Sequence, residues 1–182
     1  MQFYISMSEQ EQRLRLSGAI PSLEEFWRYR LGSSALDVLL ALNEFSWEDM
    51  DLGREFHDDE DVRRIRRYTN TIVSAVNDLL SLRKEVQRGG VDSLVPILVY
   101  RGGDVHKAVE EVVEFIGAEI EGMDRAAAAL LRRYGMADRD VQRQVKNYVD
   151  GCKHYATGNV SWSLSTDRYR VEQVDGDVVM TL

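Results

Sequence analysis

The segment Glu60–Arg88, EDVRRIRRYTNTIVSAVNDLLSLRKEVQR, contains neither glycine nor proline and runs directly into Gly89-Gly90. Residues of this kind favour an α-helix, and glycine is a common helix terminator. Asp58 or Asp59 can cap the first turn, because a carboxylate accepts hydrogen bonds from the free backbone N–H groups there. The pattern therefore predicts one long helix from about Glu60 to Arg88.

Three polar side chains recur at every fourth position within this segment, namely Asn77, Ser81 and Glu85. Each step of four residues drifts by only ~40° around a helix, so all three lie on one face with a rise of ~6 Å between neighbours. They offer an amide carbonyl, a hydroxyl and a carboxylate, which are oxygen ligands for a hard cation. With one formal negative charge, the set binds Mg²⁺ well only when a phosphate completes the coordination. The competing interpretation is the solvated face of an amphipathic helix.

The chain before this helix predicts three helical segments and a break. The first, about Phe3–Leu16, is polar and helical in tendency. Ser22 and Glu25 then form a capping box, in which each side chain satisfies the other residue's backbone N–H. The helix that they open, LEEFWRYRL, is interrupted at Gly32–Ser34. The following ALDVLLALNEF predicts a third helix that is apolar enough to be buried.

The chain after Gly89-Gly90 predicts two more long helices. A short apolar segment, SLVPILVY, comes first, and Gly102-Gly103-Asp104 then starts the first long helix. Asp138 or Asp140 starts the last one, which reaches about Leu164. The remainder, residues 166–182, is polar and is expected to be a loop and tail.

These segments predict an all-α protein, an antiparallel bundle of about six helices with short connections. Only two prolines interrupt the chain, and it contains no internal repeat or linker that would separate two domains. We therefore expect residues 1–182 to form a single domain, helical over residues 1–165, with residues 166–182 as a closing loop and tail.

The composition excludes several classes of function. Hydrophobic residues at 44% and charged residues at 30% indicate a globular protein, and the net charge of −8 does not favour nucleic acid as a partner. An anionic substrate must then be held by local cations or by metal. A single cysteine, Cys152, rules out an internal disulfide. No apolar run approaches the ~20 residues that span a bilayer, so we expect no membrane span and a cytoplasmic location.

A second motif lies near the C-terminus. Trp162 stands six residues before Arg168-Tyr169, at the end of the last expected helix. An arginine beside a tyrosine can donate several hydrogen bonds to a diphosphate. An isolated Arg-Tyr pair is otherwise an ordinary surface feature, so its meaning depends on the spacing to Trp162 and on the motif at Asn77.

Together the two motifs resemble those of class I terpene synthases of the bacterial type. The string NDLLSLRKE resembles the family's second metal-binding motif, Asn-Asp-x-x-Ser-x-x-x-Glu, and Trp162 with Arg168-Tyr169 resembles its C-terminal Trp-x₅-Arg-Tyr motif. The resemblance covers residues 1 to about 170 and falls on the C-terminal half of the family. It implies the C-terminal half of the class I terpenoid synthase fold, without the N-terminal half that carries an Asp-rich motif.

The interrupted second helix resembles a further family feature. IPSLEEFWRYRLGSSAL resembles the Pro-Ser-Leu-x-x-Tyr segment and helix break of these enzymes, with Phe26 in place of tyrosine. The resemblance makes Arg30 the diphosphate sensor, Ser33 the linker and Ser34 the residue whose carbonyl stabilises the forming cation. Ser34 departs from the glycine that the family often has there. Arg28 is the rival sensor, although a surface role suits it better.

The resemblance also implies a function and its ligands. Mg²⁺ is bound by Asn77, Ser81 and Glu85, and a prenyl diphosphate, by default farnesyl diphosphate, is ionised and its carbocation cyclised before a proton is lost. The groups implied to bind the diphosphate are Arg30, Lys84, Arg168 and Tyr169. Because two of three metal sites belong to the missing half, this chain is expected to self-associate, to pair with a separate N-terminal half, or to be part of a longer protein.

Other interpretations are weighed against this one. The acidic run at residues 57–61 is interpreted as helix capping rather than an Asp-rich motif, because it lies too close to Asn77. Asp78 points ~100° away from Asn77 and is expected to form an ion pair. A chain-elongating prenyltransferase is disfavoured, since those enzymes use two Asp-rich motifs. A non-catalytic helical module that retains the motifs is the remaining alternative.

Overall fold

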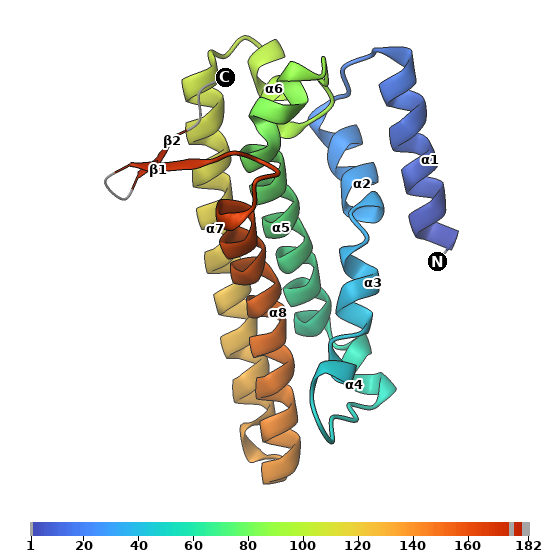
Figure 1. The fold of residues 1–182 in the computed structure, drawn as a ribbon. Helices are drawn as coiled ribbons and strands as arrows, with labels where there is room; N and C mark the ends of the chain where they lie inside the picture. The colour runs from blue at the N-terminus through green and yellow to red at the C-terminus, as the bar shows by residue number, and fades with distance from the viewer. Residues whose placement is uncertain (1, 175–176, 180–182) are drawn as a thin grey trace.

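The structure, a computed structural model, describes residues 2–174 and 177–179. Within them the chain is helical apart from one short hairpin (Figure 1). The helices are α1 (Gln2–Ser17), α2 (Leu23–Ser33), α3 (Leu36–Ala41), α4 (Arg54–Asp58), α5 (Glu60–Gln87), α6 (Leu94–Tyr100), α7 (Val105–Arg133) and α8 (Arg139–Ser165), with 3₁₀ turns at Glu44–Ser46 and Tyr134–Met136. The antiparallel hairpin pairs β1 (Glu172–Val174) with β2 (Asp177–Val179).

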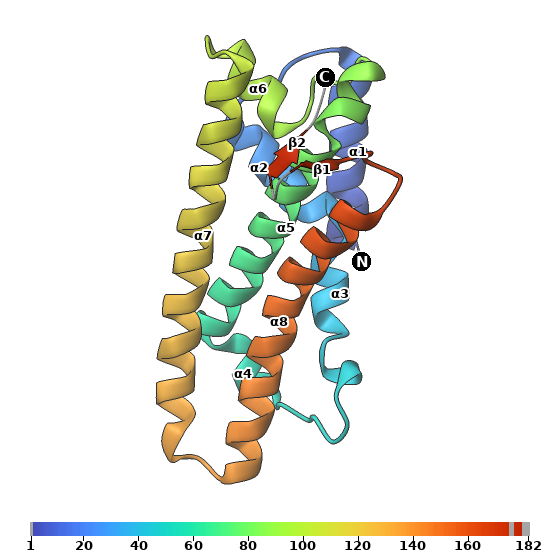
Figure 2. The same cartoon turned by 60° about the vertical axis from the view of Figure 1, so that its left-hand side comes forward.

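Helix α5 occupies the centre of the bundle. Helices α7 and α8 pack along one side of it, and α1, α2 and α3 lie on the other side (Figures 1 and 2). The all-α prediction is thus confirmed, although the described residues hold more and shorter helices than the six expected. In this part of the chain, no helix combines the length and the apolar character needed to cross a membrane.

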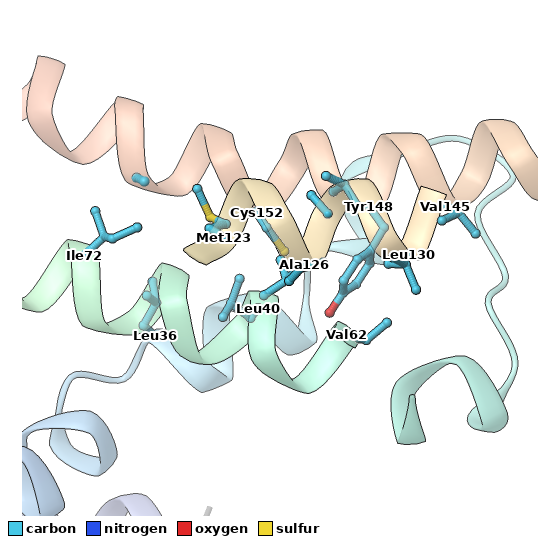
Figure 3. Close-up of a cluster of buried hydrophobic side chains, with 14 of the residues drawn as sticks. Leu36, Leu40, Val62, Ile72, Met123, Ala126, Leu130, Val145, Tyr148 and Cys152 are labelled. Atoms are coloured by element: carbon cyan, nitrogen blue, oxygen red, sulfur yellow. The ribbon is translucent and has the colours of Figure 1, made fainter. Parts of the chain in front are cut away.

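The larger hydrophobic core lies where α3, α5, α7 and α8 meet (Figure 3). Tyr148 and Cys152 of α8 point into it, and burial raises the pKa of the Cys152 thiol to about 12. This thiol is therefore part of the packing and is not a reactive group. Side chains of three other helices complete the cluster, including Leu36, Leu40, Val62, Ile72, Met123, Ala126 and Leu130.

A second hydrophobic core joins α2, α6 and α7 to the C-terminal half of α5. Phe26 and Tyr29 of α2 are each 1% exposed and pack on Leu94, Ile97 and their neighbours. Phe26, which stands where the resemblance places a tyrosine, is therefore a core residue. This core fixes α2 against α5, and so it determines where the break after α2 lies.

The predicted helix starts are confirmed. The Ser22–Glu25 capping box is formed in both directions, and the Asp104 side chain accepts a hydrogen bond from the Lys107 backbone N–H. Asp59 and Asp138 cap α5 and α8 in the same way. Each cap satisfies a backbone donor that the helix leaves free, which is why the acidic residue identified the boundary in the sequence.

Three local predictions were wrong or only partly right. The third helix is only six residues long, and just Leu36 and Leu40 of it are buried, because they alone face α5. The break, expected at Gly32–Ser34, falls at Ser34 and Ala35, so the prediction was right only for Ser34. The polar end of the chain is not all loop, since it contains the hairpin β1–β2. Polar strands this short carry almost no periodicity, and their pairing was therefore not visible in the sequence.

We predict that Asp59→Ala lowers the free energy of unfolding by about 1 kcal/mol, because α5 loses its cap. Burial acts to raise the pKa of Asp59, but its hydrogen bond and charge pairing with Arg133 lower it on balance. The loss is therefore present above pH about 4 and shrinks as the pH falls through the lowered folded pKa. Urea unfolding of both proteins at several pH values measures this loss in the free energy of unfolding. Asp58→Ala, at an exposed position, is the matched control and should change stability little; equal losses would contradict the assignment of the cap.

Candidate functional site

The predicted metal ligands lie on one face of α5, where the helix repeat brings them into line. Ser81 is fully buried, and its hydroxyl donates a 2.5 Å hydrogen bond to the Glu85 carboxylate. Asn77 lies one turn earlier on the same face. The Glu85 side chain is 27% exposed, so this row of oxygens can be reached from solvent at its Glu85 end.

Arg30 reaches this face from the end of α2. Its Nη2 donates to Asn77 Oδ1 at 3.0 Å, and its Nη2 and Nε donate to Asp78 Oδ1 at 2.6 and 3.1 Å. Arg28, the rival sensor, instead pairs with Glu24 on the exposed side of the same helix. The structure thus places Arg30, and not Arg28, beside the predicted metal ligands.

Asp78 holds Arg30 in place and connects three helices. Its second oxygen accepts a hydrogen bond from the Leu94 backbone N–H at 3.2 Å, where α6 begins. Burial disfavours the charged forms of both partners, but the charge and hydrogen bonds of Asp78 outweigh it for Arg30, whose pKa is raised. Burial raises the pKa of the Asp78 carboxyl, and the guanidinium opposes that shift. Asp78 is therefore ion-paired, as expected.

Tyr169 packs against the same face from the other side of the bundle. Asn77 Nδ2 donates a 2.8 Å hydrogen bond to the Tyr169 hydroxyl, and Tyr169 is only 3% exposed. The Trp162 ring packs edge-on against the Tyr169 ring at 5.8 Å, although half of Trp162 stays exposed. The spacing between Trp162 and Tyr169 therefore has a physical reason, since the indole positions the tyrosine where the chain leaves α8 (Figure 1).

Two cations accompany Tyr169. Lys84 Nζ lies 5.5 Å from the centre of its ring, and the Arg168 guanidinium lies 5.7 Å from it. Burial lowers the pKa of Lys84, as do the nearby charges of Arg168, Arg88 and Arg15, while Glu85 acts against the shift. Arg168 itself is exposed. Of the predicted diphosphate ligands, Arg30 and Tyr169 contact Asn77 directly, and Lys84 and Arg168 gather around Tyr169.

The break after α2 is built around a left-handed residue. Ala35 has φ 61°, which turns the chain between α2 and α3. The Ser33 hydroxyl donates to Arg30 O at 3.5 Å, and the Ser34 hydroxyl donates to Asn70 Oδ1 at 2.8 Å. Within the described residues the Ser34 carbonyl accepts no backbone hydrogen bond. Ser34 thus presents a free carbonyl, as the sequence analysis expected of the break.

Asn70 is a residue that the sequence analysis missed. Its Nδ2 donates to Leu31 O at 2.8 Å, and its Oδ1 accepts from both Ser34 and Ser74. It therefore attaches the break to α5, two turns before Asn77 on the same face. Asn70 lies seven residues before Asn77, and this spacing places the two on the same face of α5. A single asparagine in a helix does not, however, reveal which residue it binds.

The alternative metal motifs are accounted for by other contacts. Asp59 and Asp61 both pair with Arg133, which joins the start of α5 to the end of α7. His57 lies 2.7 Å from Glu44. Across the described residues, no three His, Cys, Asp or Glu side chains converge as a metal site. The acidic run thus serves capping and pairing.

The residues on α5 fit a Mg²⁺ ion in the chemistry of their donors. Ser81 and Glu85 already converge to 2.5 Å, and all three groups carry oxygen. The Asn77 oxygen accepts one hydrogen bond from Arg30, which leaves its second lone pair for a ligand. The single carboxylate makes the set weak by itself, and it suits a metal whose coordination is completed by a phosphate.

Comparison with known proteins shows the family of the chain. Residues 1–121 match the family described as terpene synthase family 2, C-terminal metal binding. The chain is also 37% identical over 178 residues to the sesquiterpene cyclase hepA of Aspergillus oryzae, covering 97% of this chain and 47% of that protein. It is 32% identical to pristinol synthase of Streptomyces pristinaespiralis, covering 92% of this chain and 46% of that protein. The chain therefore belongs to the terpene synthase family, and it spans about half the length of these relatives.

The fold agrees with solved structures. The linalool/nerolidol synthase of Streptomyces clavuligerus, solved with 2-fluorogeranyl diphosphate, superposes with a TM-score of 0.80 at 23% identity, over 92% of this chain and 56% of that one. A cucumene synthase variant, T181N, gives a TM-score of 0.76 at 20% identity, over 92% of this chain and 55% of that one. The architecture is thus the helical fold of class I terpenoid synthases.

We predict that Arg30→Met lowers the free energy of unfolding by about 3 kcal/mol, because it leaves the buried Asp78 carboxylate without its partner. Chemical denaturation measures the change. Arg28→Met, on the exposed side of the same helix, should stay within about 0.5 kcal/mol. The double variant Arg30→Met/Asp78→Asn should recover part of the loss. If the two single variants were equally destabilised, the ion pair would not have the structural role assigned to it.

We predict that Ala35→Gly raises the free energy of unfolding by about 0.5–1 kcal/mol, because glycine adopts the left-handed conformation without a steric penalty. Thermal and urea unfolding measure the change. The same replacement at Ala118, an exposed position within α7, should have the opposite sign and cost about 1 kcal/mol. A loss of stability at both positions would argue against strain at Ala35.

Proposed function

We propose that this chain is the C-terminal half of a class I terpene synthase that ionises a prenyl diphosphate with Mg²⁺, with farnesyl diphosphate as the default substrate. The observation that carries the proposal is that the Asn77 side chain contacts both Arg30, from the break after α2, and Tyr169, from the C-terminal motif. Asn77 donates to Tyr169 and accepts from Arg30, although these residues lie 92 and 47 positions away in the sequence. Names of relatives such as sesquiterpene cyclase support the choice of a C15 substrate.

Asn77, Ser81 and Glu85 would hold one Mg²⁺, which would neutralise charge on the leaving diphosphate. The chain's own cations would bind the same group: Arg30 from the break, Lys84 from α5, and Arg168 with Tyr169 from the end of α8. Arg30 contacts Asn77, and Lys84 and Arg168 lie beside the Tyr169 ring. The two hydrophobic cores pack together the helices that carry these residues. Charge on the departing diphosphate is thus stabilised by groups already in position.

Arg30 would couple diphosphate binding to the metal ligands. Its Nη2 now donates to the Asn77 oxygen, while Asp78 keeps the guanidinium from leaving the site. A diphosphate that attracts Nη2 would take the positive guanidinium away from this oxygen and so strengthen the oxygen as a metal ligand. The break at Ser33 and Ser34 would respond to that movement, because the Arg30 carbonyl accepts from the Ser33 hydroxyl and the Ser34 N–H. The free Ser34 carbonyl would then stabilise the allylic cation.

The length of the chain bears on whether it acts alone. Its relatives are about twice as long, and the Asp-rich motif expected to hold further metal ions belongs to the other half. We propose that this half-bundle self-associates, pairs with a separate N-terminal half in the cytoplasm, or is part of a longer protein. The expected closing segment, residues 166–182, would cover the diphosphate; residues 175–176 and 180–182 of it lie outside the described residues. The alternative is a helical module that retains the site but does not turn over substrate.

We predict that the chain binds inorganic pyrophosphate in a Mg²⁺-dependent manner, measured by isothermal titration calorimetry with and without an added N-terminal half. Glu85→Gln should weaken this binding at least about tenfold, because it removes the only carboxylate among the three ligands. Glu114→Gln, an exposed carboxylate on α7, is the matched control. If wild-type protein shows no Mg²⁺-dependent binding even with the N-terminal half, the non-catalytic module is the correct assignment. Release of terpene from farnesyl diphosphate then decides between binding and catalysis.

A further inference from the structure

A groove follows the face of the bundle that α2, α5 and α7 form. Its middle is a hollow of about 430 Å³, whose walls include Trp27, Tyr68 and Phe115. The Trp27 and Phe115 rings lie 5.3 Å apart and also line an apolar hollow of about 240 Å³ beside the first. Tyr68 packs on Gly122 of α7 and stands nine residues before Asn77, on the opposite side of α5. This face is therefore directed away from the metal ligands.

The groove carries opposite charges at its two ends. Glu24 and Glu111, from α2 and the first half of α7, line the apolar hollow. Arg64 and Arg67, from the first half of α5, line the other end beside Tyr68. Glu111 stands eleven residues before Gly122, which Tyr68 contacts, and this corresponds to a rise of about 16 Å along α7. The acidic and basic ends are thus well separated along the bundle.

Most of these charges have no partner within the chain. Across the described residues, Arg67, Glu111 and Glu114 form no ion pair, whereas Arg64 pairs with two carboxylates of its own helix. Arg67 acts at longer range on the half-buried Glu119, where its charge opposes the rise in pKa that burial causes. Unpaired charges of opposite sign at the two ends of one face favour a partner with the reverse arrangement.

A second copy of the same chain has that reverse arrangement. A two-fold rotation about an axis perpendicular to α7 reverses the direction of the groove, so the acidic end of each copy meets the basic end of the other. Ala118 lies between the two ends, and it is small and exposed, which allows two α7 helices to approach closely. Trp27 and Phe115 are only partly buried and supply the aromatic centre that such an interface needs.

We infer that this groove is the interface of a symmetric homodimer, in which each copy places its α7 against the groove of the other. Glu111 and Glu114 of one copy then face Arg64 and Arg67 of its partner, and symmetry repeats the contact. The interface closes at two copies and leaves the metal ligands uncovered, because they lie on the opposite side of α5. It goes beyond the proposed function and does not depend on diphosphate binding.

Charge reversal tests the interface. Glu111→Lys and Arg67→Glu should each weaken dimerisation of the full chain by about tenfold, since symmetry makes each substitution act at two contacts. An equimolar mixture of the two variants should recover dimers of wild-type strength, because both contacts of the mixed dimer again join opposite charges. Sedimentation velocity over a series of protein concentrations measures the dissociation constants. Glu48→Lys and Arg139→Glu make the same charge changes at exposed positions outside the groove and are the matched controls.

The outcomes separate this face from other ways of associating. Weakening in the single variants with recovery in the mixture supports the interface. A wild-type chain that stays monomeric at every concentration overturns it, as do dimers that the two variants leave unchanged, since their contact lies elsewhere. If the chain binds only an added N-terminal half, and Arg67→Glu weakens that binding, the groove belongs to that half and the homodimer is overturned. Mg²⁺-dependent pyrophosphate binding by the same samples tests the proposed function separately, because neither substituted residue belongs to that site.

Discussion

The buried ion pair between Arg30 and Asp78 is the contact on which the arrangement of the site depends. It joins the end of α2 to the middle of α5, and the second Asp78 oxygen ties in the start of α6. Two charges away from water are stable only when each finds its partner, so the geometry of three helices is specified at one point. Arg30 is thereby held within 3.0 Å of Asn77.

Around this pair the site has two kinds of polar group. Asp78 and Asn70 have their hydrogen bonds satisfied by the protein and fix the break and the helix starts. Glu85, Lys84 and Arg168 remain partly or fully open to solvent. The first kind gives rigidity, and the second leaves capacity for a ligand. Asn77 belongs to both kinds. Its amide oxygen accepts a hydrogen bond from Arg30, and its amide nitrogen donates one to Tyr169. Both partners are also proposed ligands of the diphosphate.

Much of this arrangement could be predicted from sequence because it is local. The extent of α5, the caps at Ser22, Asp59, Asp104 and Asp138, and the common face of Asn77, Ser81 and Glu85 all follow from the helix repeat and from free N–H groups at helix starts. The choice of Arg30 over Arg28 rested on resemblance, and the structure adds the reason, since only Arg30 faces α5. The length of α3 was misjudged, and the break was predicted correctly only at Ser34. An apolar run does not reveal which of its residues has a packing partner. Alanine rarely adopts a left-handed conformation, so the sequence gives no sign that Ala35 does so.

The sequence by itself thus determined the long helices, the family resemblance and the row of oxygens on α5, because these depend on residue spacings and helix caps that can be identified directly in the sequence. Only the tertiary structure decided that Asp78 neutralises Arg30, that Asn70 secures the break, and that Trp27 and Phe115 share one groove with Arg67. These groups are far apart along the chain, and their meeting depends on how the two cores pack α2, α5 and α7. Contact energies between such residues exist only once the helices have been brought together, and so no local pattern encodes them.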